Sequence, residues 1–240
     1  MAQLYDQGLA YTTINTARSA LSTLCMKGNY VFGKHPLVVR FMRGVFNQRP
    51  TQARYNEIWD VSGVLRRLET MSPVASLTYK QLLKKALMLT ALISAARLHT
   101  LHKFDVNIML KGKSSYTFKF DSVMKQSRDG YAVQPLTLRA YPHRRLCIYT
   151  VFKEILRRRI LLNIKCTKIF TTTKRPYKWL SKLTLANWMK EILRDSGIDT
   201  RVYKAHSVRT AAVNKAEKSD LPIDDILKTA GWSNDSMFRK

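Results

Sequence analysis

His206 and Arg209 are the two residues whose types and spacing point most directly to chemistry. Because they lie three positions apart in a predicted helix, their side chains project from the same face. A guanidinium in that position can stabilise negative charge that develops on phosphoryl oxygens, and an imidazole beside it can accept or donate a proton. Trp232, directly after Gly231, adds one indole N–H donor. Taken together, these residues favour a site that holds a phosphodiester.

Cleavage of a phosphodiester by a protein nucleophile requires more than one fixed donor on the non-bridging oxygens. Arg97 is the candidate for a second guanidinium, since this group is permanently charged and donates in a bidentate fork. It follows Ser94-Ala95-Ala96, small residues that let elements pack closely, at the end of an apolar helix predicted over 77–96.

Each of these residues also has a plain structural interpretation. An arginine at the end of a helix compensates the helix dipole, which would account for Arg97 alone. His206 and Arg209 would suit a solvated helix face, and Trp232 would suit a hydrophobic core. The combination of all four residues in this order favours the functional interpretation.

The elements that must position these residues are predicted to be mainly helical. Apolar residues recur at spacings of three and four through most of the chain, including residues 1–46, where Pro36 begins a second helix. A later helix carries Thr184 as its predicted N-cap. The predicted helices cover 12–24, 36–46, 60–70, 77–96, 143–164, 184–193, 206–218 and 222–230.

One stretch, 104–138, has a different pattern. Tyr116 and Phe118 alternate with polar residues, and Asp129-Gly130 is a hairpin signal before a further apolar alternation. We therefore predict a fold that is mainly α with a small antiparallel three-stranded sheet (α+β).

The charge of the chain points to a polyanionic partner. Lys and Arg total 42 against 16 acidic residues, a formal net charge of +26. The basic residues are spread along the whole chain, which favours nucleic acid over an acidic membrane. An RNA-binding protein of another class is disfavoured, since neither an aromatic RNP motif nor a G-x-x-G clamp is present.

Metal, disulfide and membrane sites are not expected. Cys25, Cys147 and Cys166 form no C-x-x-C pair and indicate a reducing compartment. His99 and His102 lie three apart, yet no carboxylate or cysteine accompanies them. No apolar run has the length of a membrane span, and the N-terminus has no signal-peptide pattern.

A polar stretch that contains Pro50 divides the chain. We predict a helical DNA-binding domain over 1–48, a linker over 49–57 and a second domain over 58–240.

The chain resembles the tyrosine recombinases of the phage-integrase type, and most of all the recombinase-like proteins of animal mobile elements. The resemblance extends nearly from end to end. The segments that carry it are 11–22, His35-Pro36-Leu37, 44–47, Trp59-Asp60-Val61, Ser94-Ala95-Ala96-Arg97, His206-Ser207-Val208-Arg209 and Ala230-Gly231-Trp232-Ser233. It implies a SAM-like core-binding domain at 1–48, incomplete at its start, and a recombinase catalytic domain at 58–240 that lacks its last helix.

The resemblance also implies roles for single residues. Arg97 and Arg209 would clamp the scissile phosphate, with His206 assisting and Trp232 donating a hydrogen bond. Lys125, on a β-hairpin, would be the general acid for the leaving 5′ oxygen, with Lys113 and Lys119 as lesser candidates. The residues expected to bind DNA are Arg18, Lys34, Arg40, Arg43 and Arg128.

Two positions depart from the family pattern. Thr100 stands where many relatives carry an acidic residue, and residues 233–240 contain no Tyr to serve as the nucleophile. Two functions stay open: a site-specific recombinase or integrase that breaks and rejoins DNA through a 3′-phosphotyrosyl intermediate, inactive as this truncated chain, and a repurposed, non-catalytic DNA-binding protein. This chain is expected to form no covalent DNA adduct.

The resemblance further implies the partners and setting of the protein. Duplex DNA is the expected partner, and no cofactor or metal is required. We expect a nuclear protein that is monomeric when free, with a homotetramer on DNA if the full-length chain has the exchanged C-terminal helix.

Overall fold

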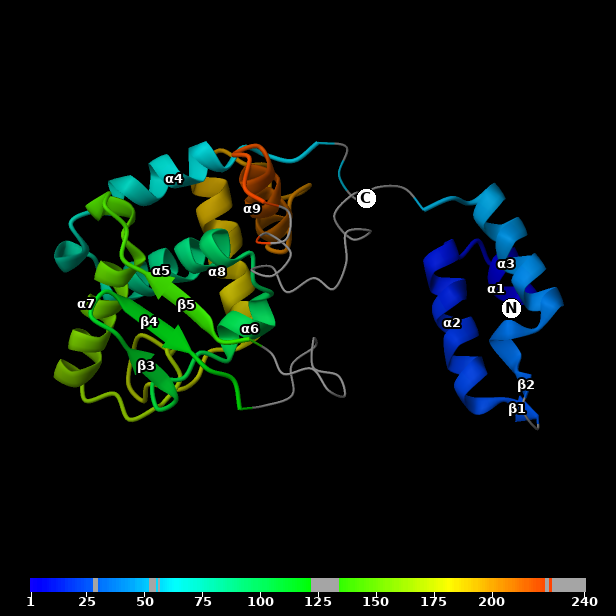
Figure 1. Ribbon diagram of the computed structural model, residues 1–240, viewed down its shortest axis with the longest axis horizontal. Coiled ribbons are helices and arrows are strands. Elements are labelled where there is room, and N and C mark those ends of the chain that lie inside the picture. The colour runs from blue at the N-terminus through cyan, green and yellow to red at the C-terminus, as the bar shows by residue number, and fades with distance from the viewer. Residues whose placement is uncertain (28–29, 52–54, 56, 122–133, 223–224, 226–240) are drawn as a thin grey trace. The chain divides into compact units, whose positions relative to one another are not determined.

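The protein consists of two compact units, Met1–Asn56 and Glu57–Lys240 (Figure 1). The computed structural model describes residues 1–27, 30–51, 55, 57–121, 134–222 and 225. Helices predominate, and one antiparallel three-stranded sheet lies in the second unit, so the predicted fold class is confirmed. None of the described helices combines the length and the apolarity needed to cross a membrane.

The first unit is a small helical bundle. Ile14, Met42 and Val45 are buried at its centre. Its two long helices match the helices predicted over 12–24 and from Pro36, and a short β-ribbon that was not predicted separates them. The elements are α1 (Ala2–Asp6), α2 (Tyr11–Leu24), β1 (Met26–Lys27), β2 (Tyr30–Val31), a 3-10 turn (Phe32–Lys34) and α3 (Pro36–Gln48).

Arg49 fixes the end of α3 against the start of the chain. Its Nη1 donates to the carbonyl oxygens of Tyr5 at 2.9 Å and Leu9 at 3.1 Å. The same guanidinium lies 3.9 Å from the centroid of the Tyr5 ring, a cation–π contact. A residue from the predicted linker therefore stabilises the first unit.

The second unit is built around α5 (Tyr79–Ser94), whose side chains are buried on nearly every face. Figure 1 shows α5 among the other helices, and it packs against α6, α7, α8 and α9. A helix that is apolar all round must be covered on all sides, which is why it forms the centre. The helices around it are α4 (Val61–Thr70), α6 (Leu98–His102), α7 (Ile148–Leu161), α8 (Lys182–Asp195) and α9 (Ser207–Glu217).

Helix boundaries depend on caps, and one predicted cap was wrong. Thr78 and Gln81 form a capping box at the start of α5, with Gln81 N donating to Thr78 Oγ1 at 3.3 Å. In α8 the N-cap is Ser181, whose Oγ accepts from Thr184 N at 3.1 Å. The prediction of Thr184 as N-cap was thus wrong by one helical turn. The helix predicted from 143 begins only at Ile148, after a 3-10 turn over Arg144–Leu146.

The sheet has the order β3-β4-β5 and is antiparallel throughout. Tyr116 and Phe118 alternate into the core, as predicted, and Phe118 stacks on Phe104 with ring centroids 3.9 Å apart. The predicted Asp129-Gly130 turn lies outside the described residues. The strands are β3 (Met109–Lys111), β4 (Ser115–Phe118) and β5 (Leu136–Arg139).

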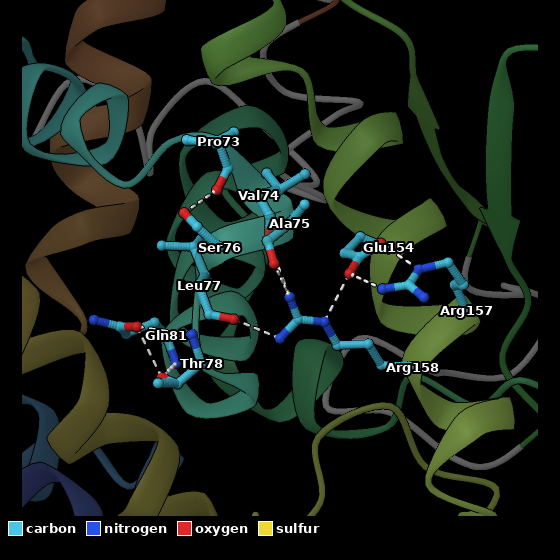
Figure 2. A network of polar contacts seen from close by, with 10 residues as sticks. All are labelled: Pro73, Val74, Ala75, Ser76, Leu77, Thr78, Gln81, Glu154, Arg157 and Arg158. Carbon is cyan, nitrogen blue, oxygen red and sulfur yellow. Dashed lines mark hydrogen bonds and ion pairs between the residues drawn. The ribbon is translucent and has the colours of Figure 1, made fainter.

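Arg158 joins α7 to the chain segment before α5 (Figure 2). Its Nη2 donates to the carbonyl oxygens of Val74 at 3.2 Å and Ala75 at 2.9 Å, and its Nη1 donates to that of Leu77. Its Nε donates to Glu154 Oε1 at 2.7 Å. Each nitrogen of this guanidinium has a partner, so Arg158 holds the scaffold together.

Candidate active site

Arg97 lies just after a sharp change of chain direction at the end of α5. The helix ends at Ser94, and Ala95 adopts the left-handed conformation with φ 45° and ψ 23°. A non-glycine residue in this conformation costs on the order of 1 kcal/mol or more, so its surroundings must hold it there. Ala95 is buried against Ala212 and Val213 of α9. The small residues at 94–96 thus bring the end of α5 against α9, as the sequence suggested.

Arg97 itself is the N-cap of α6, not the end of the long helix. The predicted position at a helix C-terminus was therefore wrong, and dipole compensation no longer accounts for the residue, because the N-terminal end of a helix is its positive end. Its Nη1 is buried and has no hydrogen-bond partner among the described residues. A buried donor of a charged group is costly to leave unpaired, which points to an anionic ligand.

His206 and Arg209 lie at the start of α9. His206 is its N-cap residue and is exposed, without a side-chain capping bond. Arg209 is half-buried, and its Nη1 donates to the carbonyl oxygen of Ala95 at 2.8 Å. Burial, together with the smaller effect of the Arg97 charge, lowers the pKa of Arg209 to about 10. The two guanidinium groups therefore lie close enough to repel each other.

A pocket of about 340 Å³ brings these three residues together. Among the described residues, its lining includes five side chains that are cationic or can become so, and no carboxylate. That composition suits an anion. The lining residues are Ala91, Ala96, Arg97, Leu98, Ala186, Met189, Lys190, Lys204, Ala205, His206, Val208 and Arg209.

Trp59 supports the site from outside, and the sequence analysis missed this role. Its Nε1 donates to the buried Oγ of Ser207 at 2.9 Å, which holds the first turn of α9. Nearby, the Tyr203 hydroxyl donates to the carbonyl oxygen of Glu57 at 2.9 Å. The only signal in the sequence was a tryptophan directly before Asp60, the N-cap of α4.

Thr100 and the two histidines of α6 serve the packing around Arg97. Thr100 is buried, and its backbone N–H donates to the carbonyl oxygen of Arg97 at 2.8 Å. His102 stacks on Trp179 with centroids 4.2 Å apart, and burial lowers the pKa of His102. Within the described part of the chain, no group of three His, Cys, Asp or Glu residues could hold a metal ion.

Three predicted residues, Lys125, Arg128 and Trp232, lie outside the described residues. The two lesser lysine candidates are described, and neither lines the pocket. Lys113 lies in the turn between β3 and β4, and its carbonyl oxygen accepts from the Tyr149 hydroxyl at 3.1 Å. Lys119 directly follows β4 and is exposed.

The predicted DNA-binding residues of the first unit fall into two groups. Lys34, Arg40 and Arg43 are exposed, so their charges are available to a partner. Arg18 is half-buried, and its Nη1 donates to the carbonyl oxygen of Gly33 at 3.3 Å. A Cβ at Gly33 would lie 2.1 Å from Ser22 Oγ, so a larger residue at this approach of the turn to α2 would require the Ser22 side chain to move. Arg18 thus contributes to the packing of the first unit.

The two units together match solved structures of DNA recombinases. The XerH site-specific recombinase in a post-cleavage complex with palindromic difH substrate matches with a TM-score of 0.64 at 16% identity, over 98% of this chain and 65% of that one. The Tn1549 transposon integrase in complex with circular intermediate DNA matches with a TM-score of 0.60 at 11% identity, over 98% and 76%. A lambda integrase dimer bound to a COC′ core site gives 0.53 at 14%, over 98% and 74%.

The chain has the fold of the tyrosine recombinases. It spans slightly less than two thirds of the XerH recombinase, 65% in one complex and 66% in another. No family model matches the sequence. A comparison with curated proteins likewise gives no match.

Proposed function

We propose that the pocket between α5, α8 and α9 holds a phosphodiester of duplex DNA, and that the protein is a recombinase or integrase that breaks and rejoins DNA. The observation that supports this most is the meeting of Arg97, His206 and Arg209 in an anion-binding pocket, on the fold of the tyrosine recombinases. An unpartnered, buried nitrogen on Arg97 is the specific feature that a bound phosphate oxygen would satisfy.

The pocket residues divide the chemistry between them. Arg97 and Arg209 would donate to the non-bridging oxygens, where charge builds up in the transition state. His206, exposed at the mouth of the pocket, would contact the phosphate and assist proton transfer. In this proposal Lys125 is the general acid for the leaving 5′ oxygen and Trp232 a hydrogen-bond donor, and the intermediate is a 3′-phosphotyrosyl ester.

The proposal assigns duplex DNA as the partner of both units. Residues 1–48 would be the helical DNA-binding domain, in which Lys34, Arg40 and Arg43 contact the DNA backbone. Arg128 of the second unit would contact the DNA backbone as well. A net charge of +26 supports this assignment and predicts binding that weakens steeply with salt. We also place the protein in the nucleus and in a mobile element, as a monomer that assembles further on DNA.

A second candidate function is DNA binding without cleavage. One observation favours it: Thr100 occupies the position where an acidic residue supports the pocket in many relatives. The same phosphate contacts would then serve binding alone.

Binding of duplex DNA by the parent chain and by Arg209→Ala tests the phosphate pocket. The variant should stay folded, because the side chain it removes is a half-buried cation beside another cation. It should bind about tenfold more weakly, the loss of one charge-assisted contact. Equal affinities would refute the pocket assignment.

Strand transfer needs a separate assay. A nicked duplex that traps the covalent intermediate, incubated with the natural gene product, should yield an SDS-stable protein–DNA adduct. Tight, Arg209-dependent binding without an adduct would instead support the non-catalytic function.

A further inference from the structure

Lys190 is a cation of the pocket that neither the sequence analysis nor the proposed chemistry uses. It lies on α8 and is half-buried in the lining that also holds Arg97 and Arg209. Ala186, one turn earlier on the same helix, lines the pocket too. A small residue at that position leaves room in front of the lysine, so the pocket wall formed by α8 is open to a ligand.

The ammonium group of Lys190 has no task within the described part of the protein. No hydrogen bond or ion pair is found for it there. The neighbouring carboxylate, Glu191, is paired with Lys84. Lys204, the other lysine of the pocket, behaves differently, since its Nζ donates to the carbonyl oxygen of Thr200 at 3.1 Å.

The charges of the lining suit an anion. Lys190 shares the lining with two arginines, and none of the described lining residues is acidic. A bound phosphate would attract all three cations. Arginine and lysine also complement each other here, because a planar guanidinium fork fixes orientation while an ammonium group donates in three directions.

We infer that Lys190 is a further phosphate-contacting residue, which donates to the same DNA phosphate that Arg97 and Arg209 hold. This inference rests on the proposed function, since it needs a phosphate in the pocket. It assigns Lys190 the binding of an oxygen from the wall formed by α8, in addition to the contacts from Arg97 at the start of α6 and Arg209 on α9. Lysine at 190 therefore belongs to the DNA-binding machinery of the catalytic unit.

Lysine acylation followed by mass spectrometry tests the contact directly. The parent chain is treated with an N-hydroxysuccinimide ester in sodium sulfate and in sodium chloride of equal ionic strength, since sulfate mimics a tetrahedral phosphate. Lys190 should react several-fold more slowly in sulfate. Lys153, exposed on α7 and outside the pocket, is the matched control and should react equally in both salts. Equal reactivity of Lys190 in the two salts would overturn the inference.

A double-mutant cycle on duplex DNA then separates the inference from its premise. Lys190→Gln should weaken binding about tenfold and lower the salt slope by about one, while Lys153→Gln should not. Combined with Arg209→Ala, its effect should be less than additive, because both side chains hold one phosphate. Full additivity would overturn the inference.

The pattern of outcomes identifies which claim fails. If Arg209→Ala alone leaves DNA affinity unchanged, the phosphate pocket fails, and the proposed function with it. If Arg209→Ala weakens binding and Lys190→Gln does not, only the role of Lys190 is wrong. Lys190→Arg should restore most of the affinity, which a loss of binding through misfolding would not allow.

Discussion

Two groups of arginines in the second unit differ in what surrounds their nitrogens. Arg158 is saturated: Glu154 and three backbone carbonyls occupy its guanidinium (Figure 2). Arg97 and Arg209 lie in a pocket whose described lining holds no carboxylate, and Arg97 keeps a buried nitrogen without a partner in the described structure. The same side chain thus stabilises the fold where each of its nitrogens has a protein partner, and under the proposed function it binds a ligand where a donor such as Nη1 of Arg97 has no described partner.

The largest effect is expected from replacing Arg158, whose guanidinium nitrogens all have partners. Arg158→Ala leaves three carbonyl oxygens without their partner, and it leaves the 10% exposed carboxylate of Glu154 with Arg157 alone. We expect a loss of about 3 kcal/mol in the free energy of unfolding, measured by urea denaturation. DNA affinity of the folded fraction should not change. A variant as stable as the parent would show that these contacts contribute little.

The second-largest effect is expected from acid, which should weaken the contacts of Arg157 and Arg158 with Glu154. The hydrogen bond from Arg157, followed by that from Arg158, lowers the pKa of Glu154 to about 2. Because the folded pKa is below the unfolded value, the stabilisation is complete above about pH 4.5 and is lost as the pH falls towards 2. We expect about 2 kcal/mol over this range. In Glu154→Gln that part of the pH dependence of unfolding should disappear.

Replacing an arginine of the pocket should have the opposite effect on stability. Arg97→Ala removes a charge with a buried, unpaired nitrogen, so the free energy of unfolding should stay the same or rise. DNA should bind about tenfold more weakly, equivalent to about 1.4 kcal/mol. Denaturation and DNA titration of the same preparation measure both effects. A destabilisation as large as that of Arg158→Ala would erase the distinction between the groups.

The smallest effect is expected from replacing Arg157, which contacts Glu154 as Arg158 does. Arg157 contacts the same carboxylate as Arg158, yet its side chain is 57% exposed against 14%. Exposed ion pairs contribute little, so Arg157→Gln should cost no more than about 0.5 kcal/mol. The ratio of the two losses, measured in the same buffer, reports what burial and the three backbone contacts add for Arg158.

Local signals in the sequence predicted the elements well, and long-range contacts are where it failed. Helical periodicity located α2, α3 and α5, and the alternation at Tyr116 and Phe118 located β4. The cap of α8 was misplaced because Ser181 and Thr184 are both good cap residues, and the choice depends on where the chain enters the helix.

For the site, residue types were informative and positions less so. The sequence brought Arg97, His206 and Arg209 together, and the structure places all three around one pocket. It placed Arg97 at the end of α5 because nothing local reveals the left-handed turn at Ala95, which depends on packing against α9. Lys190 went unnoticed because a lysine on an amphipathic helix has no distinguishing neighbour in sequence.

The hydrogen bond from Trp59 to Ser207 also bears on how the chain is made. It joins residues 148 positions apart, so a ribosome must deliver most of the second unit before the bond can form. The carbonyls that Arg158 binds likewise wait more than 80 residues for it. Closing such loops is slow, and until α9 emerges the part of α5 that α9 covers stays exposed on the nascent chain. Synthesis is therefore the stage at which this chain exposes the most core-forming surface.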